Sequence, residues 1–179
     1  MWSQDKYLKA LNFASKWHLG QKIPGSELPY IIHPVAVAME IIKAIPFEHK
    51  ISEGDFCVES ALLHDVLEDT EATYSLVLKE FGKKTADGVL ALTKNKDFSN
   101  KKEAMKDSLE RIKNQPFEIW LVKIADRISN LYKPPSFWTK IKIKNYFEES
   151  LLILEELGKE SCFLSKRLKK KIETYKGWI

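Results

Sequence analysis

The chain has 179 residues, 44% of them hydrophobic, and its 29 basic and 25 acidic side chains leave a formal net charge of +4. This composition supports a sizeable core in one domain and excludes a disordered or fibrous chain. The small positive excess permits an anionic ligand without requiring nucleic acid as a partner.

The opening residues 1–6 contain no apolar signal segment, and no apolar run approaches the ~20 residues that span a bilayer. Two cysteines, Cys57 and Cys162, each lie in an apolar helical pattern, which indicates reduced thiols in the core. We therefore expect a cytoplasmic protein that does not associate with a membrane.

Apolar residues recur at helical spacing from one end of the chain to the other, and no segment alternates like a strand. Residues rich in glycine, proline or polar side chains separate the helical segments. The pattern predicts an all-α fold over residues 1–179, a single domain packed as an irregular bundle of about eight to nine helices. The predicted helices cover about 7–18, 35–42, 55–69, 73–81, 85–92, 103–113, 117–131, 138–157 and 162–176.

The segment Ala61–Thr70 contains four polar groups in an otherwise apolar helix: His64, Asp65, Glu68 and Asp69. His64 and Asp65 are adjacent, and the two acids follow one turn later on the same flank. Burying these groups without a metal or a partner would cost several kcal/mol. A solvated acidic helix end is the simpler interpretation, but acids at a helix C-terminus oppose the helix dipole. The segment by itself therefore indicates a metal site no more strongly than a solvated helix end.

Two further segments place polar residues among apolar neighbours. His33 lies in Pro29–Pro34, just before a predicted helix, and a lone histidine there is more often a core residue than a ligand. Asp126 and Asn130 are four residues apart in a helix that is otherwise apolar on that side. Convergence of all three segments on one ion is the simplest single explanation.

These segments resemble the metal-dependent HD-domain phosphohydrolases, in the branch formed by the hydrolase domain of RelA/SpoT proteins and the small alarmone hydrolases of the Mesh1 type. The resemblance covers most of the chain and follows the order of motifs in that family. The matching segments are His18-Leu-Gly-Gln21, Pro29–Pro34, Ala61–Thr70, Phe81-Gly82, Thr93-Lys-Asn-Lys96 and Lys123–Leu131.

The resemblance implies that His33, His64, Asp65 and Asp126 bind one divalent metal per chain, usually Mn²⁺, and that Glu68 and Asp69 are the general acid/base pair. Two imidazoles and two carboxylates suit a six-coordinate ion better than a closed tetrahedral zinc site. The implied activity is removal of the 3′-pyrophosphate from guanosine tetra- or pentaphosphate, (p)ppGpp. The expected partner is accordingly a small nucleotide.

The resemblance also suggests residues that contact the substrate. They are Lys22 in the loop after Gln21, Lys96 and Lys101 in or beside the polar loop at 94–102, Asn130, Lys142 and Tyr146. Relatives usually carry an arginine against the guanine base in the first of these loops. Residues 21–28 contain no arginine, so we expect weaker discrimination of guanine, because lysine cannot stack as a guanidinium does.

Two alternatives remain open at this point. The enzyme could act on another nucleotide, such as NADPH or a nucleoside polyphosphate. The chain could instead be a nucleic-acid or protein-binding module with a structural or vestigial metal site, to which the basic run Lys166–Lys171 would contribute. Such a run is usually a solvated helix face, and all six ligand and acid positions hold chemically competent residues, which argues against a vestigial site. The oligomeric state is not predicted.

Overall fold

The computed structural model describes residues 1–95, 98 and 100–179, with the main chain but not the side chain of residue 101. These residues form nine α-helices and no strand, which confirms the predicted all-α fold. The helices are α1 (Gln4–Trp17), α2 (Ile32–Ala44), α3 (Gly54–Leu63), α4 (Val66–Asp69), α5 (Tyr74–Leu92), α6 (Lys101–Lys113), α7 (Phe117–Asn130), α8 (Lys140–Leu157) and α9 (Leu164–Tyr175).

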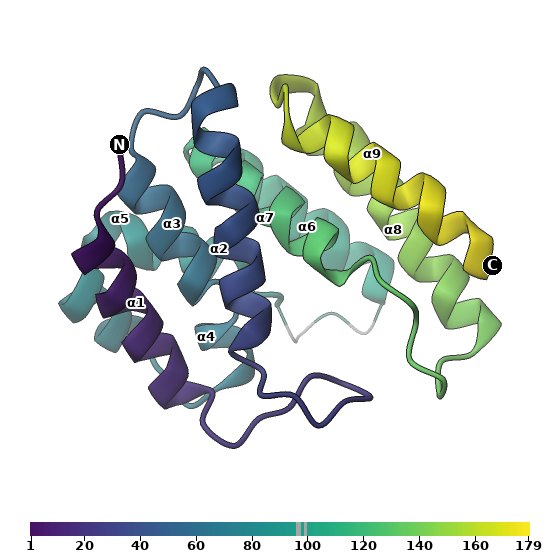
Figure 1. The fold of residues 1–179 in the computed structure, drawn as a ribbon, viewed down its shortest axis with the longest axis horizontal. Coiled ribbons are helices and arrows are strands. Elements are labelled where there is room, and N and C mark those ends of the chain that lie inside the picture. The colour runs from purple at the N-terminus through teal and green to yellow at the C-terminus, as the bar shows by residue number, and fades with distance from the viewer. Residues whose placement is uncertain (96–97, 99) are drawn as a thin grey trace.

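Helix α7 is the central element of the bundle. It packs against α2 and α3 on one side and against α8 and α9 on the other. Figure 1 shows α8 and α9 lying side by side at one end of the molecule, with α1, α3 and α5 at the other end. One continuous hydrophobic core joins these helices, and nearly every side chain from Glu118 to Ser129 is buried in it. The charged residues of α7 therefore lie inside the protein and need partners there.

The predicted helix over 55–69 is wrong as a single element, because it breaks at His64 and Asp65 into α3 and α4. The imidazole Nδ1 of His64 donates to the main-chain oxygen of Ala61 at 2.8 Å. In an uninterrupted α-helix that carbonyl would accept the main-chain N–H of Asp65, so the histidine side chain competes with the backbone. The break lies where the polar groups are concentrated.

The two helices predicted over 73–81 and 85–92 form the two halves of α5. Gly82 separates them with a φ of 81° and non-helical geometry. A residue with a side chain rarely adopts this left-handed φ, which explains the glycine at this position.

The prediction that both free thiols lie in the core is confirmed for Cys57, which is buried, and is wrong for Cys162, which is exposed. Cys162 precedes the first turn of α9, because that helix begins only at Leu164. In the part of the chain that the structure describes, no helix combines the length and apolar character needed to cross a membrane.

Candidate metal centre and its pocket

Three segments that are far apart in the sequence bring possible metal ligands together. His33 lies in the first turn of α2, His64 directly follows α3, and Asp126 lies on α7. The Nε2 atoms of the two imidazoles are 3.1 Å apart, and Oδ1 of Asp126 is 3.4 Å from Nε2 of His33. Both histidines are buried: 8% of the surface of His33 and 3% of the surface of His64 are exposed. The structure thus assembles a group of side chains that could hold a metal ion.

The hydrogen bonds of the two histidines direct their Nε2 atoms toward each other. His64 uses Nδ1 to donate to Ala61, which leaves its Nε2 as an acceptor, and Nδ1 of His33 lies 3.3 Å from Oγ of Ser129. A proton on Nε2 of His33 or a cation between the rings would satisfy both Nε2 atoms. Burial lowers the pKa of His33, but the carboxylates of Asp126 and Asp65 outweigh it and raise that pKa to about 9. The same negative field favours a bound cation.

Asp65, the fourth ligand that the sequence predicts, lies beside both imidazoles but outside the group of His33, His64 and Asp126 whose ligand atoms all lie within 4.8 Å of one another. Its Oδ2 lies 2.9 Å from Nε2 of His64 and 3.5 Å from Nε2 of His33, and it accepts a 2.5 Å hydrogen bond from the hydroxyl of Tyr30. Burial raises the pKa of Asp65, but the imidazoles of His64 and His33 outweigh burial and hold it well below its usual range. Two imidazoles and two ionised carboxylates therefore face one small volume, a donor set that fits a divalent ion with nitrogen and oxygen ligands.

Glu68 and Asp69 lie beside this group on the short helix α4. Oε1 of Glu68 accepts from the ammonium of Lys94 at 3.1 Å, and its Oε2 accepts from the main-chain N–H of the same lysine at 2.9 Å. Asp69 is held through its main-chain oxygen, which accepts from Nε2 of Gln21 at 2.6 Å. Burial, together with the charges of Asp65 and Glu68, raises the pKa of Asp69. One carboxylate is thus paired with a cation, whereas the other tends to keep a proton.

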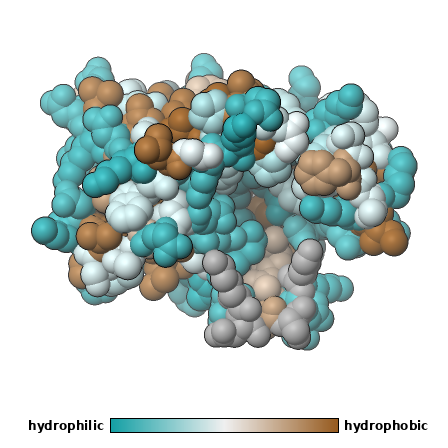
Figure 2. Space-filling view, turned by 90° about the horizontal axis from the view of Figure 1, so that it is seen from below, coloured by the Kyte–Doolittle hydropathy of each residue, from teal (hydrophilic) through white to brown (hydrophobic). Residues whose placement is uncertain are grey.

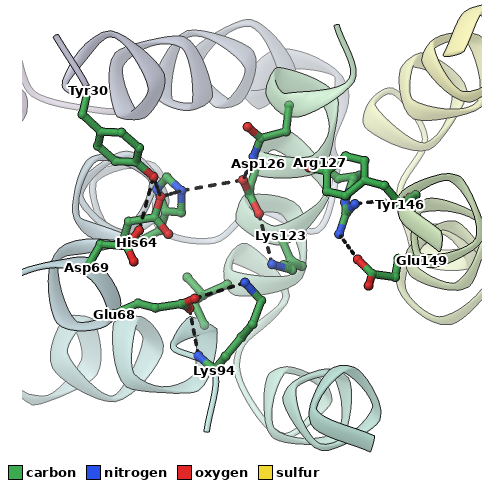
Figure 3. A pocket seen from close by; sticks show the side chains of 13 residues that line it. Tyr30, His64, Glu68, Asp69, Lys94, Lys123, Asp126, Arg127, Tyr146 and Glu149 are labelled. Carbon is green, nitrogen blue, oxygen red and sulfur yellow. Dashed lines mark hydrogen bonds and ion pairs between the residues drawn. The ribbon is translucent and has the colours of Figure 1, made fainter. Parts of the chain in front are cut away.

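A cavity of about 160 Å³ connects these groups. Its lining side chains come from α4, α5, α7 and α8 and from the segments that precede α2 and follow α3 and α5, and Figure 3 shows them around one space. Figure 2 shows the molecule from below, hollowed near its middle, with hydrophilic side chains bordering the hollow. The lining residues are Tyr30, His64, Asp65, Glu68, Asp69, Leu92, Lys94, Lys123, Asp126, Arg127, Asn130, Tyr146 and Glu149.

The structure separates the predicted substrate contacts into groups. Asn130 and Tyr146 line the cavity, and Asn130 donates to Oδ1 of Asp126 at 2.6 Å. Lys22 is exposed and pairs with Glu27, and neither it nor Lys142 is a lining residue. The ammonium of Lys142 instead lies 4.2 Å from the ring centre of Trp138.

The remaining two predicted contacts stay predictions. Lys96 lies outside the described residues, and so does the side chain of Lys101.

Sequence reasoning did not single out six residues of the cavity: Tyr30, Leu92, Lys94, Lys123, Arg127 and Glu149. Lys123 is buried and donates to Oδ2 of Asp126 at 3.0 Å. A lysine three residues before a buried aspartate on an apolar helix face was an available signal for this pair. Arg127 also lines the cavity, with its guanidinium 3.9 Å from the ring centre of Tyr146.

The model of the HD domain family matches residues 10–153 of the chain. The chain belongs to the HD-domain family. An HD domain implies a divalent metal, in agreement with the His/Asp group described above.

Relatives match this HD-domain protein over most of its length. The guanosine-3′,5′-bis(diphosphate) 3′-pyrophosphohydrolase MESH1 of Mus musculus is 30% identical over 172 residues, covering 93% of this chain and 92% of that protein. The enzyme of the same name from Danio rerio is 29% identical, covering 90% and 89%. A solved structure described as a metazoan ortholog of SpoT that hydrolyzes ppGpp has a TM-score of 0.84 and 25% identity, covering 100% of this chain and 99% of that one.

Proposed function

We propose that this HD-domain protein is a guanosine-3′,5′-bis(diphosphate) 3′-pyrophosphohydrolase that depends on one Mn²⁺ ion per chain. The observation that carries the proposal is the convergence of two buried imidazoles and two ionised carboxylates directly beside Glu68 and Asp69. Relatives that match this chain nearly end to end bear that enzyme name. The proposed substrate is a nucleotide of the cell interior, so the proposal places the enzyme in the cytoplasm.

His33, His64, Asp65 and Asp126 would hold the ion. A divalent ion held there supplies positive charge for the phosphoryl group in the transition state and makes water more acidic. Manganese is proposed because the family resemblance implies it, and the mixed nitrogen and oxygen donor set is compatible with that ion. Tyr30 and Asn130 orient the two carboxylates by donating to Oδ2 of Asp65 and Oδ1 of Asp126. Such supporting hydrogen bonds keep ligating oxygens in place.

Glu68 and Asp69 divide the proton transfers between them. Water attacks the phosphorus that is bonded to the ribose 3′ oxygen, and Glu68 takes the proton of that water. The bond between phosphorus and the 3′ oxygen then breaks, and Asp69 gives a proton to the departing oxygen. The raised pKa of Asp69 suits this acid role, because the group retains a proton at a pH where an ordinary aspartate has lost it. Pyrophosphate and a 3′-hydroxyl are the products.

Recognition of guanine has less support than the other parts of the proposed function. Lys22 is the cation in the loop where relatives usually carry an arginine, and it points to Glu27 rather than into the cavity. This observation favours reduced discrimination of guanine, and it keeps NADPH or another nucleotide as the second candidate substrate.

The testing experiment measures pyrophosphate and phosphate release by the Mn²⁺-loaded full chain from ppGpp, its adenine counterpart and NADPH at matched concentrations. We expect pyrophosphate release from ppGpp, with a smaller preference over the adenine compound than a loop arginine would confer. If the enzyme hydrolyses NADPH but not ppGpp, the proposed substrate is wrong and the second candidate takes its place. Inactivity toward all three with stoichiometric Mn²⁺ bound would contradict both.

A further inference from the structure

The cavity has three cationic side chains among its described lining residues, and they differ in their partners and in their exposed fraction. Arg127 is buried and donates to the main-chain oxygen of Tyr146 at 3.4 Å and to Glu149 at 3.2 Å. Lys123 has 7% of its side chain exposed and is paired with the buried Asp126. Lys94 alone of the three keeps a large exposed fraction, 48% of its side chain.

Lys94 is attached to Glu68 in two ways. Its main-chain N–H donates to Oε2 of Glu68 at 2.9 Å, and its ammonium donates to Oε1 at 3.1 Å. Figure 3 shows both contacts meeting at the end of the Glu68 side chain, with the ammonium on the side of Lys123. The two contacts are independent, so the ammonium can leave Oε1 while the main chain still holds Oε2.

We propose that Lys94 is a substrate-binding residue whose ammonium exchanges Oε1 of Glu68 for an oxygen of the 3′-pyrophosphate group. This inference rests on the proposed function and names the residue that receives the leaving pyrophosphate.

Electrostatics favours the exchange. The ammonium end of this ion pair is the accessible one, because 48% of the Lys94 side chain is exposed against 17% of the Glu68 side chain. A pyrophosphate group carries more total negative charge than a carboxylate and offers more acceptor oxygens, and a lysine ammonium binds such a group as a point charge. Burial lowers the pKa of Lys94, but the charges of Glu68, Asp126 and Asp65 outweigh burial and raise that pKa, so the ammonium stays charged for an incoming anion.

The experiment measures binding of inorganic pyrophosphate to the Mn²⁺-loaded full chain by calorimetry, after removal of unbound metal, together with kcat and KM for ppGpp. We expect Lys94→Gln to raise the pyrophosphate Kd and the KM for ppGpp by about 10- to 100-fold, the range for a hydrogen bond to a charged group. The conservative Lys94→Arg should recover most of the binding, because it restores the charge. Metal content and the melting temperature should stay at wild-type values.

The matched control is Lys6→Gln. Lys6 pairs with Asp55 at 2.8 Å, has 55% of its side chain exposed and lies outside the cavity, so its loss should leave the pyrophosphate Kd unchanged. An unchanged pyrophosphate Kd in Lys94→Gln, or absence of pyrophosphate binding to the wild type, would overturn the proposal. A fall in kcat with KM unaltered would also overturn it, because Lys94 would then act only by positioning Glu68. If pyrophosphate binding depends on Lys94 while ppGpp is inert, the substrate proposal fails and this inference stands.

Discussion

Glu118 links the start of α7 to the start of α3. Three candidate metal ligands lie on α7 or directly after α3. Glu118 lies in the first turn of α7, is 2% exposed, and its Oε1 accepts three hydrogen bonds at the start of α3. The donors are the main-chain N–H and the hydroxyl of Ser52, both at 2.9 Å, and the main-chain N–H of Glu53 at 3.0 Å. His64 follows the far end of α3, and Asp126 lies further along α7. We therefore predict that replacing Glu118 destabilises the fold and weakens metal binding.

The size of the effect follows from what each substitution leaves behind. Glu118→Gln keeps an acceptor oxygen but loses the charge, which roughly halves the strength of such bonds and should cost about 1–3 kcal/mol. Glu118→Ala leaves donors at residues 52 and 53 without their acceptor, at about 1–3 kcal/mol each, so we expect a loss of about 3–5 kcal/mol. In a chain of this size a loss of 1 kcal/mol lowers Tm by about 2–4 °C, so the alanine variant should melt roughly 10 °C lower.

The pH dependence has a definite sign. Burial raises the pKa of Glu118, but the hydrogen bonds from the main chain at residues 118, 53 and 52 and from the Ser52 hydroxyl outweigh it and lower that pKa below the usual 4.5. A depressed folded-state pKa contributes stability above the unfolded-state pKa, and that stability is lost as the pH falls through the folded value. The wild type should therefore lose its advantage over Glu118→Gln below about pH 4.5.

Thermal unfolding of the wild type, Glu118→Gln and Glu118→Ala from pH 3 to pH 7 checks this reasoning, with Mn²⁺ affinity at neutral pH as the functional readout. A matched control is Glu110→Gln, because Glu110 is an exposed acid in an ion pair with Lys113. If Glu118→Gln is as stable as the wild type at pH 7, or if the difference between them grows as the pH falls, the buried carboxylate does not stabilise the α3–α7 junction.

Further predictions concern the metal centre and the acid/base pair. His64→Ala and Asp65→Ala should lose bound metal while circular dichroism shows the helical content retained, and stoichiometric metal in Asp65→Ala would refute its assignment as a ligand. Glu68→Gln and Asp69→Asn should keep the metal and lower turnover by about 10²–10⁴-fold, and a variant of either residue at the wild-type rate would clear that residue of a proton-transfer role. Tyr30→Phe removes the hydrogen bond to Oδ2 of Asp65, so its metal Kd, measured by calorimetry, should rise about 10–100-fold; an unchanged Kd would show that the hydroxyl does not support the site.

The sequence by itself determined the helical class and the identity of the candidate ligands. Helical periodicity depends on residues three and four apart, so it could be recognised without any tertiary information. Polar residues within apolar helices marked His64, Asp65 and Asp126 for the same reason: burial without a partner is costly whatever the fold. His33 needed the family resemblance, since a lone histidine beside a helix start carries little signal.

Tertiary structure decided which side chains meet. The 3.1 Å approach of His33 to His64 depends on how α2 packs against α3, and the pairing of Glu68 with Lys94 depends on where α5 ends relative to α4. Contacts between elements of this kind leave no periodic trace in the sequence. Packing also decided that Lys22 pairs with Glu27 and that Arg127 lines the cavity. The predicted helix over 55–69 is interrupted because the side chain of His64 competes with the backbone for a carbonyl. The candidate residues could thus be identified from the local sequence pattern. Their partners depend on long-range packing, because an ion pair forms only between charges that the fold places within a few ångströms.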